Sequence, residues 1–444
     1  MDRQNKPDSK IVIIAITILI FSILCFGAVE VWSSVLLEAS VFILALLWLI
    51  SRRKEHFLTP SKEEKYMLAI LLGFLAYTFI QMLPHSPAIL KYLSPESFKL
   101  YSFYAVDKEP HMSVSLHPSK THVEFLRMLT YSLFFFLLSF SIKDMATIQR
   151  MLKILSYFGF GLAVFAIIQK ATWSGKIYWF REISAGSPFG PFVNRNHYAG
   201  LIGMLIPLGL GVVFTRRSRE RKIFFGFLSL IMVVSLFLSL SRGGIISFFT
   251  GIAVFALLVS KDKFRAKKIW ALGAFIFVLF LYLLYLGIDP IIDRFYKTDI
   301  TTEERLVVWS ATLKAFKDFY LTGSGLGTFI NIFPLYSPEG ILALYDHAHN
   351  DYLEFILEAG IIGTAFLLLF LVFFIRYMNK VRWEGHRGII KISLISSITT
   401  MAVHSIFDFN LHIPSNALML SAVFAMAVAC SRIDNKQQAI TSNE

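Results

Sequence analysis

The chain has 444 residues, of which 56% are hydrophobic and only 16% are charged, and its mean hydropathy is +0.62. Soluble domains carry about 25% charged residues, so this composition excludes a soluble globular protein and predicts a polytopic membrane protein. The net charge of +13 does not imply nucleic-acid binding, because the basic residues gather at one membrane face. The two cysteines indicate no disulfide framework.

Twelve segments are long and apolar enough to cross a bilayer, which takes about 20 mostly apolar residues. They cover residues 11–29, 32–50, 66–83, 124–142, 151–170, 197–215, 223–241, 244–260, 269–287, 353–375, 388–407 and 415–431. We expect the first to be retained, because its apolar run is longer than that of a signal peptide and lacks a small-residue cleavage site. SLSRGG (239–244) breaks a long apolar stretch, so we predict a tight turn there. The sequence thus predicts an all-α membrane protein, with residues 1–444 as a single membrane-embedded domain.

Basic residues gather in alternate loops of this arrangement. With a cytoplasmic N-terminus, 28 of the 43 Lys and Arg residues fall in or beside the cytoplasmic segments. These segments are 1–10, 51–65, 143–150, 216–222, 261–268, 376–391 and 432–444. The positive-inside rule therefore predicts that both termini are cytoplasmic, and it explains the net charge without nucleic acid.

The opposite face carries the larger loops, at 84–123, 171–196, 288–352 and 408–414. The first shows strand-like alternation, and we expect a small structured cap there. Within the longest loop, TTEERLVVWSATLKAFKDF places apolar residues at 306, 309, 313 and 316, which predicts an amphipathic helix whose apolar face lies on the membrane or on the bundle mouth. GSGLGTF (323–329) follows, and we expect a flexible turn.

Two polar stretches on the outward face supply cations. PFVNRNHYAG (191–200) places Asn194, Arg195 and Asn196 at a helix start, where free N–H groups favour an anion. A helix cap with a lipid-facing arginine explains the same residues equally well. Arg242 lies in the SLSRGG turn, where it contacts either a lipid phosphate or a ligand at the bundle mouth. Arg305 is the third candidate cation, although an exposed helical arginine commonly pairs with a nearby acid such as Glu303.

The stretch DHAHNDYLEFILEAGIIG (346–363) loads polar residues onto the start of a span. His347 and His349 suggest a metal site, but the sequence offers no clear further ligands, so we predict no metal and no cofactor. A catalytic base is better motivated, because an ordinary histidine has a pKa near 6.5. The alternative is a polar cap, with Asn350 or Asp351 starting the helix.

Two further acids follow on this helix. Glu354 and Glu358 share a helix face. Glu358 lies about 12 Å along the axis from Asn350, so its carboxylate needs a partner or stays protonated. A second polar stretch on the same face, HSIFDFNLHIPSN (404–416), contains His404, Asp408, Asn410 and His412. For these we expect core or capping roles, with contact to a glycan or acceptor as the alternative.

These motifs together resemble the O-antigen ligase / O-antigen polymerase superfamily of bacterial membrane glycosyltransferases of the C type. His349-Asn350, nine residues and Gly360-Ile361-Ile362-Gly363 are similar to that family's signature of His, a polar residue, nine residues and Gly-x-x-Gly. FVNRNHYAG, SRGG before a span, and Arg305 with Trp309 before GSGLGTF occur in the family's order. The resemblance covers roughly residues 150–430, and the first 120 residues carry no matching motif.

The resemblance implies a metal-independent inverting enzyme in the bacterial inner membrane, with its active site in the periplasm. It would move a glycan from undecaprenyl diphosphate to an acceptor hydroxyl, on a lipid A core for a ligase of lipopolysaccharide biosynthesis. His349 would be catalytic, and Arg242, Arg305 and Arg195 would bind the donor's diphosphate. The supporting residues would be Asn194, Asn196, His347, Asn350, Asp351 and Glu358, with Glu358 or Asp351 orienting the imidazole.

Several functions share this set of motifs. A polymerase of O-antigen or exopolysaccharide, or a protein O-oligosaccharyltransferase, would use the same donor, and the fold does not separate them. A lipid-linked glycan transporter belongs to another class. It would spread charges along a central cavity, whereas here the ionisable residues gather at one face.

Overall fold

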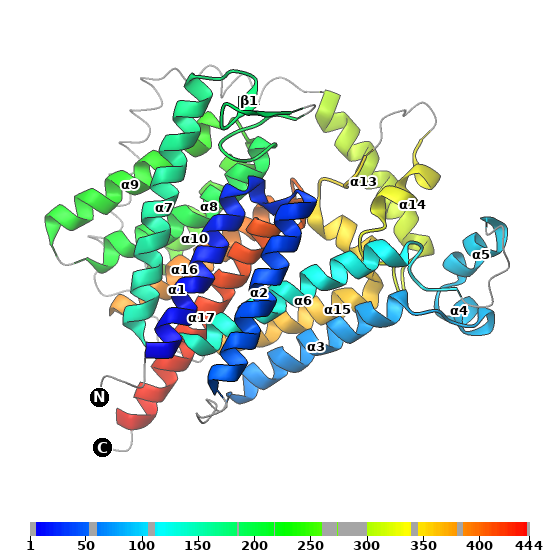
Figure 1. Ribbon diagram of the computed structural model, residues 1–444, viewed down its shortest axis with the longest axis horizontal. Coiled ribbons are helices and arrows are strands. Elements are labelled where there is room, and N and C mark those ends of the chain that lie inside the picture. The colour runs from blue at the N-terminus through cyan, green and yellow to red at the C-terminus, as the bar shows by residue number, and fades with distance from the viewer. Residues whose placement is uncertain are drawn as a thin grey trace.

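A computed structural model describes residues 6–52, 60–104, 112–183, 186–216, 218–259, 300–338, 345–379 and 385–441, together with Gly273. Within these ranges the protein is a bundle of long helices (Figure 1). They are α1 (Lys6–Leu24), α2 (Val31–Arg52), α3 (Lys62–Met82), α6 (Pro118–Ser141), α7 (Met145–Ala171), α8 (Arg195–Thr215), α9 (Arg219–Leu238), α10 (Arg242–Val259), α15 (Asp351–Asn379), α16 (Gly385–His404) and α17 (Pro414–Thr441).

These long helices confirm the prediction of an all-α polytopic membrane protein. Nine helices of the described ranges are long and apolar enough to cross a membrane. Two further helices, α1 and α16, coincide with predicted spans but are not among the nine. The remaining predicted span, 269–287, and the predicted cytoplasmic loop 261–268 lie outside the described residues.

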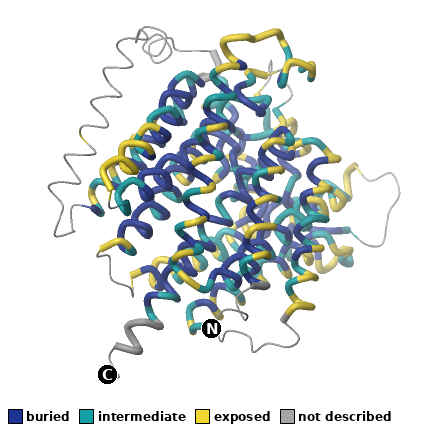
Figure 2. Tube along the Cα trace, turned by 60° about the vertical axis from the view of Figure 1, so that its left-hand side comes forward, coloured by how far each residue is buried: buried dark blue, intermediate teal, exposed yellow. Residues whose placement is uncertain are grey.

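The centre of the bundle is formed by α8 and α17. In these helices 83% and 78% of the membrane window is buried, against 33% in α2 and α15. Glycines in α8 allow close approach, because a Cβ on Gly211 would lie 2.5 Å from Ser393 Oγ of α16. Buried residues accordingly run through the middle of the bundle and exposed ones lie at its periphery (Figure 2). The sequence thus buries its central helices through small residues and leaves large apolar side chains on the outer ones.

The two ends of the bundle differ. The first helix begins and the last helix ends at the same end, while the β1 hairpin and α13 lie at the opposite end (Figure 1). The hairpin consists of β1 (Lys176–Ile177) and β2 (Arg181–Glu182), which pair antiparallel. Segments distant in sequence meet at this second end, and it contains the polar stretches.

The structure corrects the prediction for the first outward loop. Residues 84–123 contain two short helices, α4 (Pro87–Leu93) and α5 (Pro95–Tyr104), in place of the strands that their alternation suggested. Proline near each helix start and Glu96 in the first turn of α5 favour the helices. The described part of this loop retains one isolated bridge, between His85 and Met112.

The amphipathic helix predicted in the longest loop is present as α13 (Ile300–Asp318), followed by α14 (Phe329–Tyr336). Only part of its predicted apolar face packs on protein, and the exposed part is compatible with the predicted contact with the membrane. Leu306 and Leu313 are 59% and 46% exposed, whereas Val308, Ala311 and Ala315 are buried in a small core shared with α14 and the start of α15. Smaller side chains form the inner face because α13 packs closely against that core.

Candidate functional site

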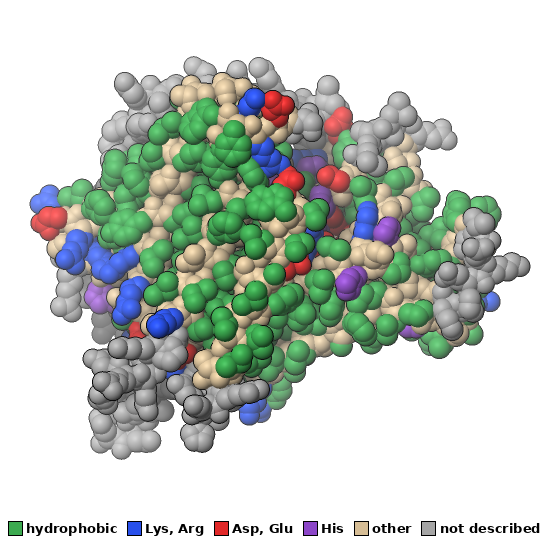
Figure 3. All heavy atoms as spheres, in the orientation of Figure 1, with side chains coloured by type: hydrophobic (Ala, Val, Ile, Leu, Met, Phe, Trp, Pro, Cys, Tyr) green, Lys and Arg blue, Asp and Glu red, His purple; other side chains and the backbone are tan. Residues whose placement is uncertain are grey.

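The polar stretches converge where α15 begins and α16 ends. Figure 3 shows histidine, acidic and basic side chains gathered in a recess beside α13, on a molecule whose remaining visible surface is largely hydrophobic. His349 lies directly before α15, and Asn350 caps that helix by accepting hydrogen bonds from the backbone N–H groups of Tyr352 and Leu353 at 3.0 and 3.1 Å. This geometry agrees with the alternative interpretation of Asn350 as a polar cap, and it leaves His349 outside the helix.

His349 adopts a left-handed backbone conformation, with φ of +50°. Non-glycine residues seldom adopt this region, and such residues concentrate at functional sites. The side chain is 23% exposed, and its Nδ1 lies 3.1 Å from Oδ1 of the buried Asp408. The ring packs edge-on against Phe409 with 5.0 Å between centroids. The imidazole is thus held on one side and open on the other.

Asp408 is the centre of a hydrogen-bond network. Its Oδ1 also accepts from the backbone N–H of Phe409 at 2.9 Å, and its Oδ2 accepts from the side-chain amide of Asn196. The amide oxygen of Asn196 in turn accepts from the Ser241 hydroxyl at 2.8 Å. The NRNH, SLSRGG, His-Asn and IFDF stretches therefore meet through one buried carboxylate.

The charge of Asp408 fixes the tautomer of His349. Burial alone would raise the pKa of the Asp408 carboxyl, but the hydrogen bond with His349 and the nearby His197 and Arg305 hold it below its ordinary value. An ionised carboxylate only accepts hydrogen bonds, so Nδ1 of His349 carries the hydrogen and Nε2 presents its lone pair. Asp408 therefore orients the imidazole, where the sequence had suggested Glu358 or Asp351.

Two of the predicted arginines adjoin this network. Arg305 of α13 donates to the carbonyl oxygen of Phe407 at 3.0 Å. Gly243, next to Arg242, also packs on Phe407. A Cβ on Gly243 would lie 2.8 Å from Phe407 Cβ. Trp309, one turn after Arg305, donates to the carbonyl oxygen of Ala348 at 3.0 Å. The turn that carries Arg242 and the helix that carries Arg305 thus both contact the residue before Asp408.

Residues 227–368 match the family model described as O-antigen ligase. The matched range includes the SLSRGG turn, Arg305 and His349. This match relates residues 227–368 to the O-antigen ligase superfamily. The match supports a role in polysaccharide biosynthesis of the ligase or polymerase type. The apolar helices of the described ranges indicate a multi-pass membrane protein. No curated protein sequence matches the chain.

A second polar cluster lies beside the first. Glu354 is buried and accepts from the backbone N–H of Ala348 at 2.8 Å, and its carboxylate lies 2.7 Å from His347 Nδ1 and 3.3 Å from His412 Nε2. Asp351 pairs with the other ring nitrogen of His412 at 3.0 Å. Burial alone would lower the pKa of His412, but the two acids raise it well above its ordinary value. The cluster is a set of hydrogen bonds and close contacts between acids and imidazole rings that fixes the loop before His349.

This cluster corrects one step of the sequence argument. The ligand atoms of His347, Glu354 and His412 lie within 4.8 Å of one another, a spacing that could hold a metal ion. The sequence suggested no third ligand because His412 lies far along the chain. In the structure Glu354 is hydrogen-bonded to the His347 ring and lies 3.3 Å from Nε2 of His412, so each ring has an acidic partner.

Glu358 has a different role from that expected. Its carboxylate oxygens accept from the backbone N–H groups of Gly327 and Phe329 at 2.9 and 2.8 Å, so it caps α14 and binds the GSGLGTF segment. The turn predicted as flexible is therefore held at its end by a buried acid. Tyr77 of α3 adds a hydrogen bond to the carbonyl oxygen of Thr322 at 2.6 Å.

Gly360 explains the glycine of the motif. It interrupts the helical backbone of α15 with φ of +64°, and a Cβ there would lie 2.5 Å from both Gly323 N and Leu321 O. The N–H of Ile361 consequently bonds the carbonyl oxygen of Tyr320 at 2.8 Å. Gly363 faces α3, where a Cβ would lie 3.3 Å from the ring of Tyr77. Gly360 thus allows the loop of residues 320–323 to pack against α15, and Gly363 allows α3 to pack against it.

Asn194 and Arg195 lie at the start of α8. Asn194 caps α8, accepting from the N–H of Asn196 at 2.9 Å, which agrees with its helix-cap interpretation. Arg195 lines a cavity on the other side of the α8 start, beside Ser239 and Leu240. The structure therefore brings Asn196 to the Asp408 network and places its sequence neighbour Arg195 on the lining of this cavity.

An apolar cavity of about 280 Å³ reaches the second cluster from within the bundle. Its walls are side chains of α3, α6, α15 and α17, and it ends at Asp351, Glu358 and His412. Its position connects the bilayer-embedded part of the protein with the polar end.

Proposed function

We propose that the chain is a metal-independent inverting glycosyltransferase that moves a glycan from undecaprenyl diphosphate to an acceptor hydroxyl at the periplasmic face. As the specific reaction we propose O-antigen ligation, with the lipid A core as acceptor. The observation that supports the chemistry best is the pair of His349 and Asp408, which lies beside Arg305 and the turn of Arg242.

In this proposal His349 is the general base. Its Nε2 takes the proton from the acceptor hydroxyl while that oxygen attacks the anomeric carbon of the donor. The bond from that carbon to the diphosphate oxygen breaks, and its electron pair leaves with undecaprenyl diphosphate. Asp408 stabilises the imidazolium that forms, as the carboxylate does in other histidine-acid pairs. Attack opposite the leaving group inverts the anomeric carbon.

Cations are needed for the leaving group. Arg242 and Arg305 are proposed to grip the diphosphate, because guanidinium groups bind phosphate oxygens bidentately and offset the charge that develops on them. Arg195 is proposed to bind the donor as well, from its separate cavity. The apolar cavity between α3, α6, α15 and α17 offers a place for part of the polyprenyl chain.

O-antigen or exopolysaccharide polymerisation and protein O-oligosaccharide transfer are the alternatives, since each uses the same donor with a different acceptor hydroxyl. A lipid-linked glycan transporter is disfavoured, because the polar network of His349 and Asp408 lies at one end of the bundle and not along a central cavity. The proposed location is the bacterial inner membrane, with both termini in the cytoplasm.

The test is glycan transfer by purified protein from a synthetic undecaprenyl diphosphate donor, with EDTA present and with lipid A core, oligosaccharide or protein as acceptor. We expect transfer to the core, loss of turnover in His349→Ala, and weaker donor binding in Arg242→Ala and Arg305→Ala. His386→Ala and Arg376→Ala, on exposed parts of α16 and α15, are matched controls. Loss of activity with EDTA contradicts the metal-free reaction and directs attention to His347, Glu354 and His412.

A further inference from the structure

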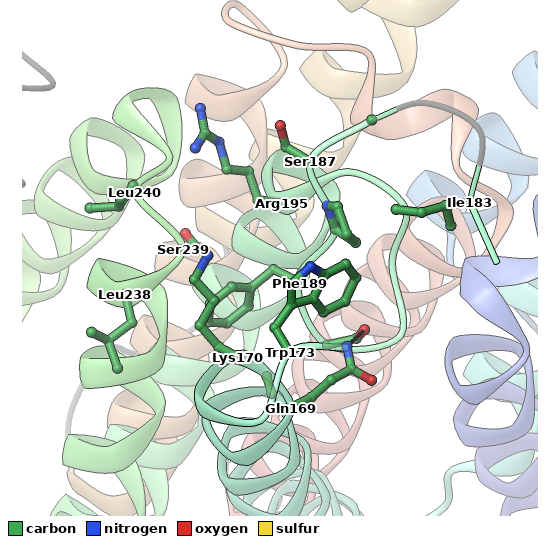
Figure 4. A pocket seen from close by; sticks show the side chains of 14 residues that line it. Gln169, Lys170, Trp173, Ile183, Ser187, Phe189, Arg195, Leu238, Ser239 and Leu240 are labelled. Atoms are coloured by element: carbon green, nitrogen blue, oxygen red, sulfur yellow. Dashed lines mark hydrogen bonds between the residues drawn. The ribbon is translucent and has the colours of Figure 1, made fainter. Parts of the chain in front are cut away.

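A second polar cavity lies beside the network and takes no part in the proton transfer proposed above. It has a volume of about 290 Å³ and is bounded by the end of α7, the loop 186–190, the start of α8 and the turn between α9 and α10. Figure 4 shows Lys170 and Trp173 on the α7 side and Arg195 on the α8 side of this space. Small-molecule sites measure about 300–1,000 Å³, so this cavity suits a single sugar residue with a substituent.

The cavity is built on a fixed frame. The side chain of Gln169 donates to the carbonyl oxygen of Gly190 at 2.7 Å and accepts from the N–H of Tyr178 at 2.8 Å. The N–H of Arg195 bonds the carbonyl oxygen of Ser187 at 2.7 Å. These bonds hold the loop against both helices, so the walls are formed before a ligand arrives and binding loses little entropy in ordering them.

The lining combines positive charge with aromatic surface. Lys170 and Arg195 are its two cations, and no Asp or Glu occurs among the described residues that line it. Trp173 is 40% exposed and lies near the buried Phe189. A cationic pair binds carboxylate or phosphate oxygens, and an indole presents a broad apolar face with a polar tip that suits the face of a sugar ring. A ligand that satisfies both features is a sugar carrying an acid group.

The position of the cavity suits binding of the glycan and not contact with the bond that reacts. Arg195 is adjacent in sequence to Asn196, which holds Asp408, but neither His349 nor Asp408 lines the cavity. Leu240 lines it two residues before Arg242. A sugar bound here therefore lies next to the proposed diphosphate site without occupying it.

We propose that this cavity binds an acidic sugar residue of the glycan substrate, through Lys170 and Arg195 to its acid group and Trp173 to its ring. The inference rests on the proposed function for the identity of the ligand as a substrate. Arg195 is then a specificity residue for the glycan, in place of a third ligand for the diphosphate.

The test separates binding from transfer. Binding of a carrier-free oligosaccharide with a terminal uronic acid is measured on the purified full chain, beside its neutral hexose counterpart, inorganic phosphate and glycerol phosphate. We expect the acidic sugar to bind preferentially, and Lys170→Gln or Trp173→Ala to weaken it about tenfold, with melting temperature unchanged. Lys176→Gln, on the neighbouring hairpin and outside the cavity, is the matched control.

If the inference is correct, His349→Ala still binds the acidic sugar even where transfer is lost. The binding result therefore tests the cavity even if the proposed function is wrong. Equal binding of acidic and neutral sugars overturns the proposal. Preferential binding of glycerol phosphate assigns the cavity to a lipid headgroup instead. With full donors, an Arg195→Gln defect that is equal for acidic and neutral glycans assigns this residue to the diphosphate.

Discussion

Replacing Asp408 by asparagine separates the charge of the carboxylate from its shape. Asp408 receives three donors: the ring Nδ1–H of His349, the backbone N–H of Phe409 and the side-chain amide of Asn196. An amide has one oxygen and one NH₂ group. In either orientation, asparagine therefore points its NH₂ group at a group that is itself a donor in the wild-type protein.

Both orientations of the asparagine amide weaken His349 as a general base. If the NH₂ group faces His349, it forces the hydrogen onto Nε2, which then cannot accept a proton. If it faces Asn196, the oxygen still accepts from Nδ1 but the negative charge is gone. A charge 3.1 Å from Nδ1 is worth about 5 kcal/mol to the imidazolium at an effective dielectric constant of about 20. This value is an upper bound, and general-base catalysis contributes about 10²–10⁴-fold.

We therefore expect Asp408→Asn to lower kcat by about 10²–10⁴-fold with little change in the KM for donor. The assay is single-turnover and steady-state transfer by purified protein in lipid nanodiscs, with the melting temperature recorded for each variant. Retention of kcat within about threefold of wild type, in a folded variant, refutes the assignment of Asp408 as the group that orients and charges His349.

Three further predictions concern the frame of the site. Gly360→Ala should lower the melting temperature, because φ of +64° with ψ of −172° is a conformation essentially restricted to glycine that costs another residue about 1–3 kcal/mol, and the new Cβ meets backbone at 2.5 Å. Gly161→Ala, with nothing within 4 Å, is the control, and equal melting temperatures of the two variants would contradict this role of Gly360. Glu358→Gln should destabilise by about 1–3 kcal/mol, because its amide group would face a backbone donor of the GSGLGTF segment; an unchanged denaturation midpoint argues against this cap. The raised pKa of His412 means that its protonation stabilises the fold fully below about pH 6.5 and that this contribution is lost as the pH rises through the raised value. Thermal stability should therefore decrease as the pH rises above 6.5 in wild type but not in His412→Gln, and parallel pH curves would show that His412 is not responsible.

Hydropathy predicted the membrane class and the described spans because helices in a bilayer must be long and apolar, whatever their neighbours. It predicted the amphipathic helix α13 but not its protein-facing residues, because the larger Leu306 and Leu313 are exposed and small Ala311 and Ala315 face the protein. A one-sided apolar pattern indicates a helix but does not say which face packs on protein in a chain that has both lipid and protein to contact.

The sequence predicted most of the residues of the candidate site but not which of them contact one another. Nothing local in the sequence indicates that Asp408 orients His349, 59 positions earlier, or that Glu358 caps a helix that begins before it at Phe329. Those pairs form because α15, α16 and the glycine loop come together in three dimensions. The HSIFDFNLH stretch was a usable signal, since its polar residues fell on the same predicted face as His349.

The measurement that tests the central claim most directly is glycan transfer by purified wild-type protein and His349→Ala, side by side, from a synthetic undecaprenyl diphosphate donor in the presence of EDTA. The account predicts an inverted glycosidic product and released undecaprenyl diphosphate with wild type, and no turnover above background with the variant. Undiminished transfer by a folded His349→Ala variant, or product that keeps the donor's anomeric configuration, would contradict it.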